Sequence, residues 1–255
     1  MAAKPWNGNS PDTGTVLNLD WQKPWLANWA AVGQGVEARW TLTADLTAAL
    51  NAAPQAPVRF VPQAELPAGM AYEAYIFKTK QVPTRQNAHD FFNGLCWLRF
   101  PKSKLRLNEL QAQAIEAQGV HSHRGPLRDA LTLFDENAAL LFSPPSLWEA
   151  VQTKDWPAMF AHHRAQWSQA QLVLFGHAAL EKLIKPYKGI TLHLLNKPLP
   201  SRMSDTEIDS WLCQQLQSEW LQAKPYIPLP VMGLPGWCPD NENPEFYEDK
   251  SVFRD

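Results

Sequence analysis

The chain has 255 residues, with 23 basic and 25 acidic side chains and a formal net charge of -2. This length allows one large domain or two small ones with a sizeable core. The near-neutral charge gives no overall attraction to nucleic acid or to an anionic membrane, so anion binding must be local. No stretch approaches the roughly 18 consecutive apolar residues of a membrane span, and the N-terminus has no apolar leader segment.

The cysteines and the N-terminal residues indicate the compartment and the domain organisation. Cys96, Cys213 and Cys238 form an odd, widely spaced set with no CxxC pair, which favours free thiols over a disulfide framework or a zinc ribbon. We therefore expect a soluble, cytoplasmic protein. Residues 1–16 are polar and rich in Gly, Pro and Asn, so we expect a mobile N-terminal segment followed by one globular domain over residues 17–255.

The first third of the chain predicts short elements separated by prolines. Trp21, Trp25 and Trp29 recur every four residues, a spacing that is typical of core packing on one helical face. Later segments are short because Pro54 and Pro57 interrupt them. In order, the pattern predicts a helix over 42–50, a strand over 58–61, a loop over 65–69 and an extended segment over 71–82.

The segment 83–108 combines an apolar face with an unusual set of polar residues. Phe91, Leu95 and Leu98 recur at helical spacing and predict a helix with one face in the core. Asn87 is a candidate N-cap, and the residue before Pro101 leaves the α region, so the helix should end at Phe100.

His89 and Asn93 are four residues apart on the other face of this helix, so their side chains should project together. Asp90, next to them, has two interpretations. It could take part in chemistry, or it could stabilise the first turn of the helix, where a carboxylate favours the positive end of the dipole. His89 could likewise be a hydrogen-bonded, half-buried structural histidine.

The rest of the chain alternates helices with short strands. Residues 127–136 fit a helix, although a hairpin turn over 135–138 is an alternative. His177 follows the apolar run 172–175 and Gly176, so it should stand where a strand leads into a helix, a frequent position for functional side chains. Further helices are expected over 108–118, 146–151, 157–167, 178–185 and 205–222, with strands over 139–142, 172–175 and 190–195.

These elements predict an α+β fold: a single, mainly helical domain with a small sheet. Beyond Lys224 the chain is rich in Pro and Gly, and we expect this C-terminal segment to lie along the domain without regular structure. No internal repeat is visible.

Several segments in combination resemble the bacterial domain-of-unknown-function family thirty twenty-five. They are QNAHDFFNGLCWLRFPKSK, RGPLRDALTLFDEN, LVLFGHAALEKL with PYKGIT, and LPGWCPDNENPEFYEDKSVFR. The resemblance extends over residues 60–254 and implies no activity. Ala138 stands where the family pattern usually has glycine. The motif residues that the resemblance groups together are His89, Asp90, Asn93, Lys104, Arg124, Arg128, Asp129, Asp135, Glu136, His177 and Glu181.

The motif residues mix acids, bases and histidines, which predicts an enzyme, best described as a hydrolase. The candidate catalytic residues, suited to acid–base chemistry, are His89, Asp90, Asn93, Asp135, Glu136 and His177. A divalent metal is a conceivable cofactor, because nitrogen and oxygen ligands suit first-row ions; its candidate ligands are His89, Asp90, Asp135 and His177. The candidate residues for binding a small phosphate- or carboxylate-bearing substrate are Lys102, Lys104, Arg124, Arg128 and Trp97.

Two other functions remain open from the sequence. Trp97, Phe100 and the basic residues of 99–106 interleave aromatic and cationic side chains, as nucleotide or single-stranded nucleic-acid sites do, although the net charge does not favour nucleic acid. Alternatively, the polar residues form a buried structural network. The His-Asp phosphohydrolase pattern does not fit, because no histidine precedes His89. The sequence also contains none of the motifs GxSxG, GxxxxGK[ST] or HExxH.

Overall fold

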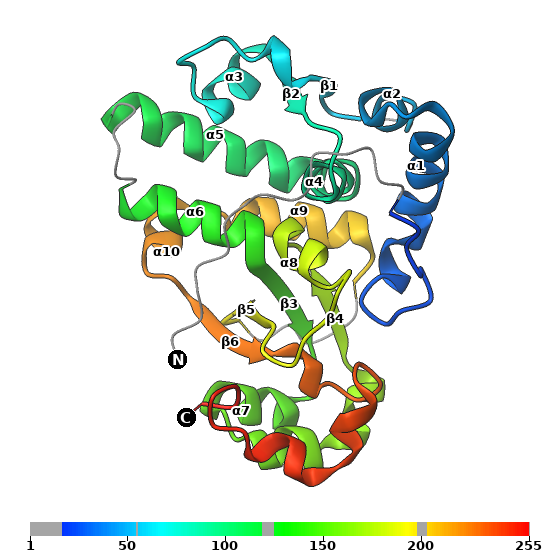
Figure 1. Cartoon of the computed structure of the whole chain (residues 1–255). Coiled ribbons are helices and arrows are strands. Elements are labelled where there is room, and N and C mark those ends of the chain that lie inside the picture. Colours follow the sequence, from blue (N-terminus) through cyan, green and yellow to red (C-terminus); the bar gives the residue numbers. More distant parts are fainter. Residues whose placement is uncertain (1–16, 55, 119–124, 198–202, 255) are drawn as a thin grey trace.

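The computed structural model describes residues 17–54, 56–118, 125–197 and 203–254. In Figure 1 a mixed sheet occupies the middle of the molecule, with α4, α5, α6, α8 and α9 on one side and α7 with the C-terminal segment on the other. The sheet strands are β3 (Ala138–Phe142), β4 (Gln171–Leu174), β5 (Thr191–Leu195) and β6 (Tyr226–Pro230).

The strand order in this sheet is β4-β3-β5-β6. The central pair, β3 and β5, runs parallel, and each edge strand is antiparallel to its neighbour. Every residue of β3 is buried, as expected for a central strand covered on both faces. Pro228 and Pro230 lie in β6, which is possible because an edge strand leaves one row of N–H groups outside the ladder.

The N-terminal part of the chain packs against α4 and α5, on the side away from the four-stranded sheet (Figure 1). It contains two parallel strands, β1 (Arg59–Pro62) and β2 (Gln81–Thr84), together with the helices around them. Asn51 fixes β1 by bonding both to the Phe60 carbonyl (2.7 Å) and to the Phe60 N–H (2.9 Å). The helices are α1 (Ala30–Thr43), α2 (Leu46–Asn51) and α3 (Tyr72–Thr79).

The central helix α4 (Ala88–Arg99) has the predicted cap and core face. The Asn87 side chain accepts a hydrogen bond from the Asp90 N–H at 2.8 Å, which satisfies one of the free donors of the first turn. Phe91 and Leu95 are fully buried. The other helices are α5 (Pro101–Gln118), α6 (Pro126–Asn137), α7 (Pro145–Thr153), α8 (His177–Lys182), α9 (Asp205–Gln215) and α10 (Ser218–Gln222).

The α+β fold class is confirmed, with helices in the majority and small sheets. One continuous cluster of buried apolar residues joins the elements, including the three tryptophans Trp21, Trp25 and Trp29. Within the described ranges, no helix has the length and apolar character needed to cross a bilayer. The predicted mobile segment 1–16 and the side chain of Arg124 lie outside the described residues.

Two expectations about helices were wrong near the centre of the chain. The segment 71–82 is not extended, because Tyr75 and Ile76 are buried on helix α3 and Lys80 ends that helix with a positive φ of 57°. Helix α5 begins at Pro101 and not at residue 108, since a proline that ends one helix is also well suited to the first position of the next.

Three later expectations also need correction. The predicted helix 205–222 is interrupted at Leu216, where the backbone becomes extended, so that α9 and α10 are separate. The segment 157–167 forms one π-helical turn and one 3-10 helix. The predicted irregular C-terminal segment contains strand β6, and beyond it only short 3-10 helices at 231–233, 239–242 and 244–248.

Gly176 allows α8 to approach the junction between α6 and β3 closely. A Cβ atom at this position would lie 2.4 Å from the Asn137 nitrogen and 2.4 Å from the Glu136 carbonyl oxygen. Both contacts are with backbone atoms, which cannot relieve a clash by changing rotamer as a side chain can. The absence of a side chain at Gly176 therefore sets where His177, the next residue, stands.

We expect Gly176→Ala to destabilise the protein by about 2 kcal/mol, the usual cost of forcing extra volume into a packed interior. Gly35→Ala is the matched control, because a Cβ there meets nothing within 4 Å; on helix α1 it should stabilise by roughly 0.5–1 kcal/mol. Urea unfolding measures both. Equal stability of the two variants would contradict the close approach.

Candidate functional site

A polar pocket of about 500 Å³ opens where α3, α4, α5, α6 and α8 meet. The apolar faces of these helices pack in one common core, and their polar side chains meet at the pocket. Its lining contains only two largely apolar residues, Leu66 and Tyr72. The lining residues are Gln63, Leu66, Tyr72, Glu73, Arg85, His89, Asp90, Asn93, Gln111, Thr132, Asp135, Glu136 and His177.

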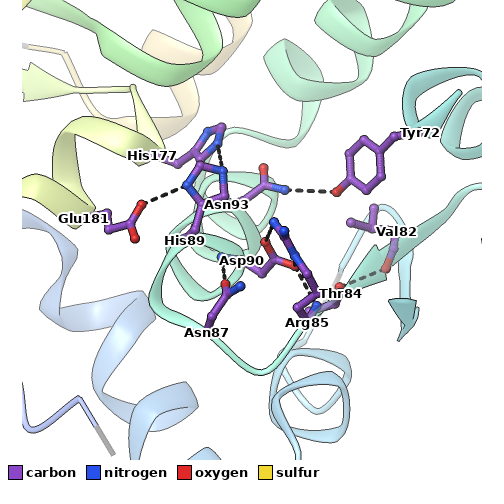
Figure 2. A network of polar contacts seen from close by, with 10 residues as sticks. All are labelled: Tyr72, Val82, Thr84, Arg85, Asn87, His89, Asp90, Asn93, His177 and Glu181. Atoms are coloured by element: carbon purple, nitrogen blue, oxygen red, sulfur yellow. Dashed lines mark hydrogen bonds and ion pairs between the residues drawn. The ribbon is translucent and has the colours of Figure 1, made fainter. Parts of the chain in front are cut away.

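Two histidines from distant parts of the chain form a hydrogen-bonded pair in this pocket. The Nε2 atom of His89 on α4 lies 3.1 Å from the Nε2 atom of His177 on α8, with the rings nearly perpendicular. On its other side, His89 Nδ1 is 2.9 Å from the Glu181 carboxylate. Figure 2 shows Glu181, His89 and His177 in this order. Because Glu181 follows His177 by one helical turn, α8 positions both partners of His89.

A buried ion pair lies behind the histidines. The Lys104 ammonium group donates to Asp135 at 2.5 Å and to the Asn93 carbonyl oxygen at 2.9 Å. The Asn93 amide then donates to the Tyr72 hydroxyl at 3.2 Å. The other Asp135 oxygen faces His177 Nδ1 at 3.8 Å, which is too long for a hydrogen bond. Lys104 therefore joins three helices behind the pocket lining.

Asp90 is held at the rim by Arg85. Its carboxylate accepts from the Arg85 backbone N–H at 2.6 Å and from the Arg85 guanidinium group at 3.2 Å and 2.8 Å. Asp90 is buried, whereas half of the Arg85 side chain is exposed. Asp90 thus holds the segment before α4 through Arg85, and it also lines the pocket.

The two histidines have opposite pKa shifts. Burial acts to lower the pKa of His89, but the hydrogen bond and charge of Glu181, with a contribution from Asp90, outweigh it and raise the pKa overall. Burial lowers the pKa of His177 to about 3, although the charge of Asp135 opposes the shift. Burial also acts to raise the pKa of Asp135, yet Lys104 and His177 hold it below its usual range.

These shifts define where the protons lie. His89 in its charged form donates from Nδ1 to Glu181 and from Nε2 to His177. His177 is then neutral, accepts at Nε2, and carries its own proton at Nδ1, facing the Asp135 carboxylate. The reverse tautomer would place a lone pair of His177 opposite a carboxylate. This proton arrangement matches the charges of the four groups, although His177 Nδ1 makes no hydrogen bond within the described residues.

The structure does not support the metal ligands expected from the sequence. Among the residues that the structure describes, no three His, Cys, Asp or Glu side chains converge on a point that could hold an ion. The ring nitrogens of His89 face Glu181 and His177, and Asp90 is occupied by Arg85. The expected set His89, Asp90, Asp135 and His177 lines one pocket, but within the set only His89 and His177 bond each other, and the arrangement is not metal-ligand geometry.

Most of the expected substrate-binding residues lie elsewhere. Lys102 bonds to Ser210 on α9 at 2.8 Å, and Arg128 is half-buried outside the pocket lining. Arg124 lies outside the described residues. Of the five expected residues, Lys104 lies directly behind the pocket lining, where it is paired with Asp135. Trp97 is buried, with Lys104 over its ring.

The basic run 99–106 is an interface between helices. Arg99 pairs with Asp205 at 2.8 Å, and Arg106 pairs with Glu109 at 2.7 Å. Phe100 is fully buried. A nucleic-acid site needs exposed rings and available cations, so burial and pairing remove the features on which the nucleic-acid alternative was based.

Sequence reasoning gave no site role to several pocket residues. Tyr72 and Glu73 fell in a segment that was expected to be extended, and Gln111 fell on a helix with a misplaced start. Glu181 was grouped with the motif residues but was assigned no function. Its spacing of four from His177, on a predicted helix, was the available signal.

The fold and site define an α+β protein with a polar pocket built around a histidine pair. Residues 58–255 match the family model described as Protein of unknown function (DUF3025), and the chain belongs to this family. No curated protein and no solved structure matches the chain.

The low pKa of His177 predicts a pH-dependent loss of stability. The unfolded chain takes up a proton on this residue below pH 6.5, whereas the folded protein does so only near pH 3, so acid favours unfolding in this window. From pH 7 to pH 5, wild type should lose about 2 kcal/mol more stability than His177→Gln. Urea titrations at both pH values test this, and parallel losses would contradict a neutral, buried His177.

Proposed function

We propose that the pocket is the active site of a hydrolase that uses general acid–base chemistry. The observation that carries the proposal is the direct hydrogen bond between His89 and His177, 3.1 Å long, at the edge of a pocket of ligand size. Two groups of one chemical type whose surroundings shift their pKa values in opposite directions supply an acid and a base together.

In this proposal His89 is the acid. Glu181 fixes its Nδ1 and favours its protonated form, so that Nε2–H is available to a leaving group. His177 is the base: its Nε2 lone pair accepts a proton from the attacking water. The substrate and water take the place of the bond between the two rings. Because the charge of His89 lowers the pKa of His177, proton release by His89 makes His177 more basic.

Asp135 and Lys104 act as positioning residues. Asp135 faces His177 Nδ1 and favours the tautomer whose Nε2 is free to accept. Lys104 keeps Asp135 ionised and orients Asn93, whose amide lines the same pocket. Asp90 and Glu136 also line the pocket.

A structural role for the same residues is the second candidate, and a specific observation favours it. The side chains of Lys104 and His177 are almost completely buried, and buried polar networks often fix the packing of a core. About a quarter of the His89 side chain is exposed. Removal of this side chain should therefore abolish turnover but keep the fold if His89 is catalytic, and should unfold the protein if His89 is structural.

The test uses p-nitrophenyl esters, p-nitrophenyl phosphate and aminoacyl p-nitroanilides as chromogenic substrates. For the substrate class that is hydrolysed, His89→Asn and His177→Asn should each lower kcat/KM by about 10²–10⁴-fold, the usual contribution of an acid–base group. His162→Asn is the matched control, because His162 is exposed and lies outside the pocket.

The same variants separate the two candidates. A folded His89→Asn protein, with an unfolding midpoint near that of wild type and no turnover, supports the active site. Unfolding of His89→Asn supports the structural network. Turnover that His89→Asn retains in full, or a wild type with no hydrolysis of any substrate class, contradicts the enzyme.

The pKa shifts also predict the pH profile of kcat/KM. His89 must be protonated to act as the acid, and its pKa lies above the ordinary 6.5, so activity should fall as pH rises through this raised pKa. His177 must be unprotonated, and its pKa is about 3, so the acid limb should lie well below pH 6.5. Glu181→Gln should move the alkaline limb to lower pH, measured with the hydrolysed chromogenic substrate. An unmoved limb would remove His89 as the acid.

A further inference from the structure

The wall of the pocket contributed by α3 and α5 contains acceptors that no protein donor satisfies. Gln111 on α5 is only 9% exposed and lines the pocket. Its amide has no hydrogen-bond partner among the described residues. Neither amide atom belongs to the fully buried atoms that lack a partner, so the amide is reached from the pocket and is free to bond a ligand there.

Glu73 on α3 also lines the pocket, and its backbone is held against α5. Asn108, one helical turn before Gln111 on α5, donates to the Glu73 carbonyl oxygen at 2.8 Å. The Glu73 carboxylate is half-buried and forms no ion pair within the described parts of the chain. The backbone of Glu73 is thus fixed in the pocket wall, and its carboxylate carries a charge that no ion pair within the described residues uses.

The lining has an excess of negative charge. Its four carboxylates, from Glu73, Asp90, Asp135 and Glu136, stand against one guanidinium group and two imidazoles, of which His177 is neutral. Even with His89 protonated, the described lining therefore carries a net charge of -2. The nearest charges behind it, Lys104 and Glu181, cancel each other.

The pKa of Tyr72, another residue of the lining, responds to the same negative charges. Burial is the main cause that raises the pKa of its hydroxyl, and the charges of Asp90, Asp135 and Glu73 add to the shift in that order. Carboxylates from α3, α4 and α6 therefore all lie near one phenol group. Such a site attracts cations and repels anions, most strongly where water is excluded.

We propose that this wall is a subsite for a substrate ammonium group, bound by the Glu73 carboxylate and the Gln111 amide oxygen. The position of the reacting bond, next to His89 and His177, rests on the proposed function. The cation subsite itself is inferred independently, from Glu73 and Gln111. The substrate class is then an amine-bearing ester or amide, and not a phosphate or dicarboxylate. An ammonium group offers three donors and no acceptor, which matches a carboxylate and an unsatisfied amide oxygen.

The experiment measures binding by calorimetry with three four-carbon probes: butane-1,4-diamine, butane-1,4-diol and succinate. The diamine should bind more tightly than the diol, and succinate should bind least. Glu73→Gln should weaken diamine binding by about tenfold, as expected for the loss of one charge-assisted hydrogen bond, and Gln111→Leu should weaken it in the same direction. The preference for the diamine over the diol and the effect of Glu73→Gln should both become smaller at high salt, because salt screens charges.

Glu65→Gln is the matched control. It makes the same charge change on an exposed residue in the same part of the fold, outside the lining, and it should leave diamine binding within twofold of wild type. Equal effects of Glu73→Gln and Glu65→Gln, or succinate binding as tightly as the diamine, would overturn the subsite.

His89→Asn separates this inference from the proposed function. The variant removes a positive charge and should bind the diamine at least as tightly as wild type does. Hydrolysis that depends on His89 without any preference for the diamine would overturn the subsite alone. Diamine binding that depends on Glu73, together with hydrolysis that does not depend on His89, would support the subsite and overturn the acid–base assignment.

Discussion

The ion pair between Lys104 and Asp135 is the interaction on which the pocket depends. It joins α5 to α6 at 2.5 Å, and the same ammonium group bonds Asn93 on α4. Loss of one member of such a buried pair costs about 3–5 kcal/mol, because the other charge is left without a partner. The pair thus fixes three helices relative to one another and sets the charge that His177 faces.

The electrostatics of the histidines follow from this arrangement. Asp135 is already neutralised by Lys104, so it favours a neutral His177 tautomer without protonating the ring. Glu181, in contrast, bonds His89 directly and stabilises its charged form. The two histidines therefore differ because burial dominates the pKa of His177, whereas the hydrogen bond and charge of Glu181 outweigh burial at His89.

Much of the fold could be predicted because local signals agreed with tertiary packing. In α4, the cap at Asn87 and the buried Phe91 and Leu95 stripe point to the same helix, and His177 does follow a strand and begin a helix. The failures occurred where one residue has two roles. Pro101 ends one helix and begins another, and Pro228 lies in an edge strand.

The candidate site was predictable in part for a similar reason. His89, Asn93, Asp135 and His177 were found because helical spacing places polar residues opposite an apolar stripe, and these faces meet at one pocket. Their partners were harder to find. Arg85 precedes its helix, and Tyr72 and Gln111 reach the pocket from elements whose boundaries were misjudged. A boundary error of a few residues rotates a side chain out of the predicted face.

The same distinction explains why counting cations along the sequence suggested an anionic ligand. The run 99–106 contains four cationic side chains, which in an unfolded chain would favour an anion. On folding, Arg99 pairs with Asp205, Lys102 turns to Ser210, and Arg106 pairs with Glu109. Lys104 is used behind the pocket lining. A ligand meets only the charge that is left after this internal pairing. At this pocket, the lining carries more carboxylates than cations.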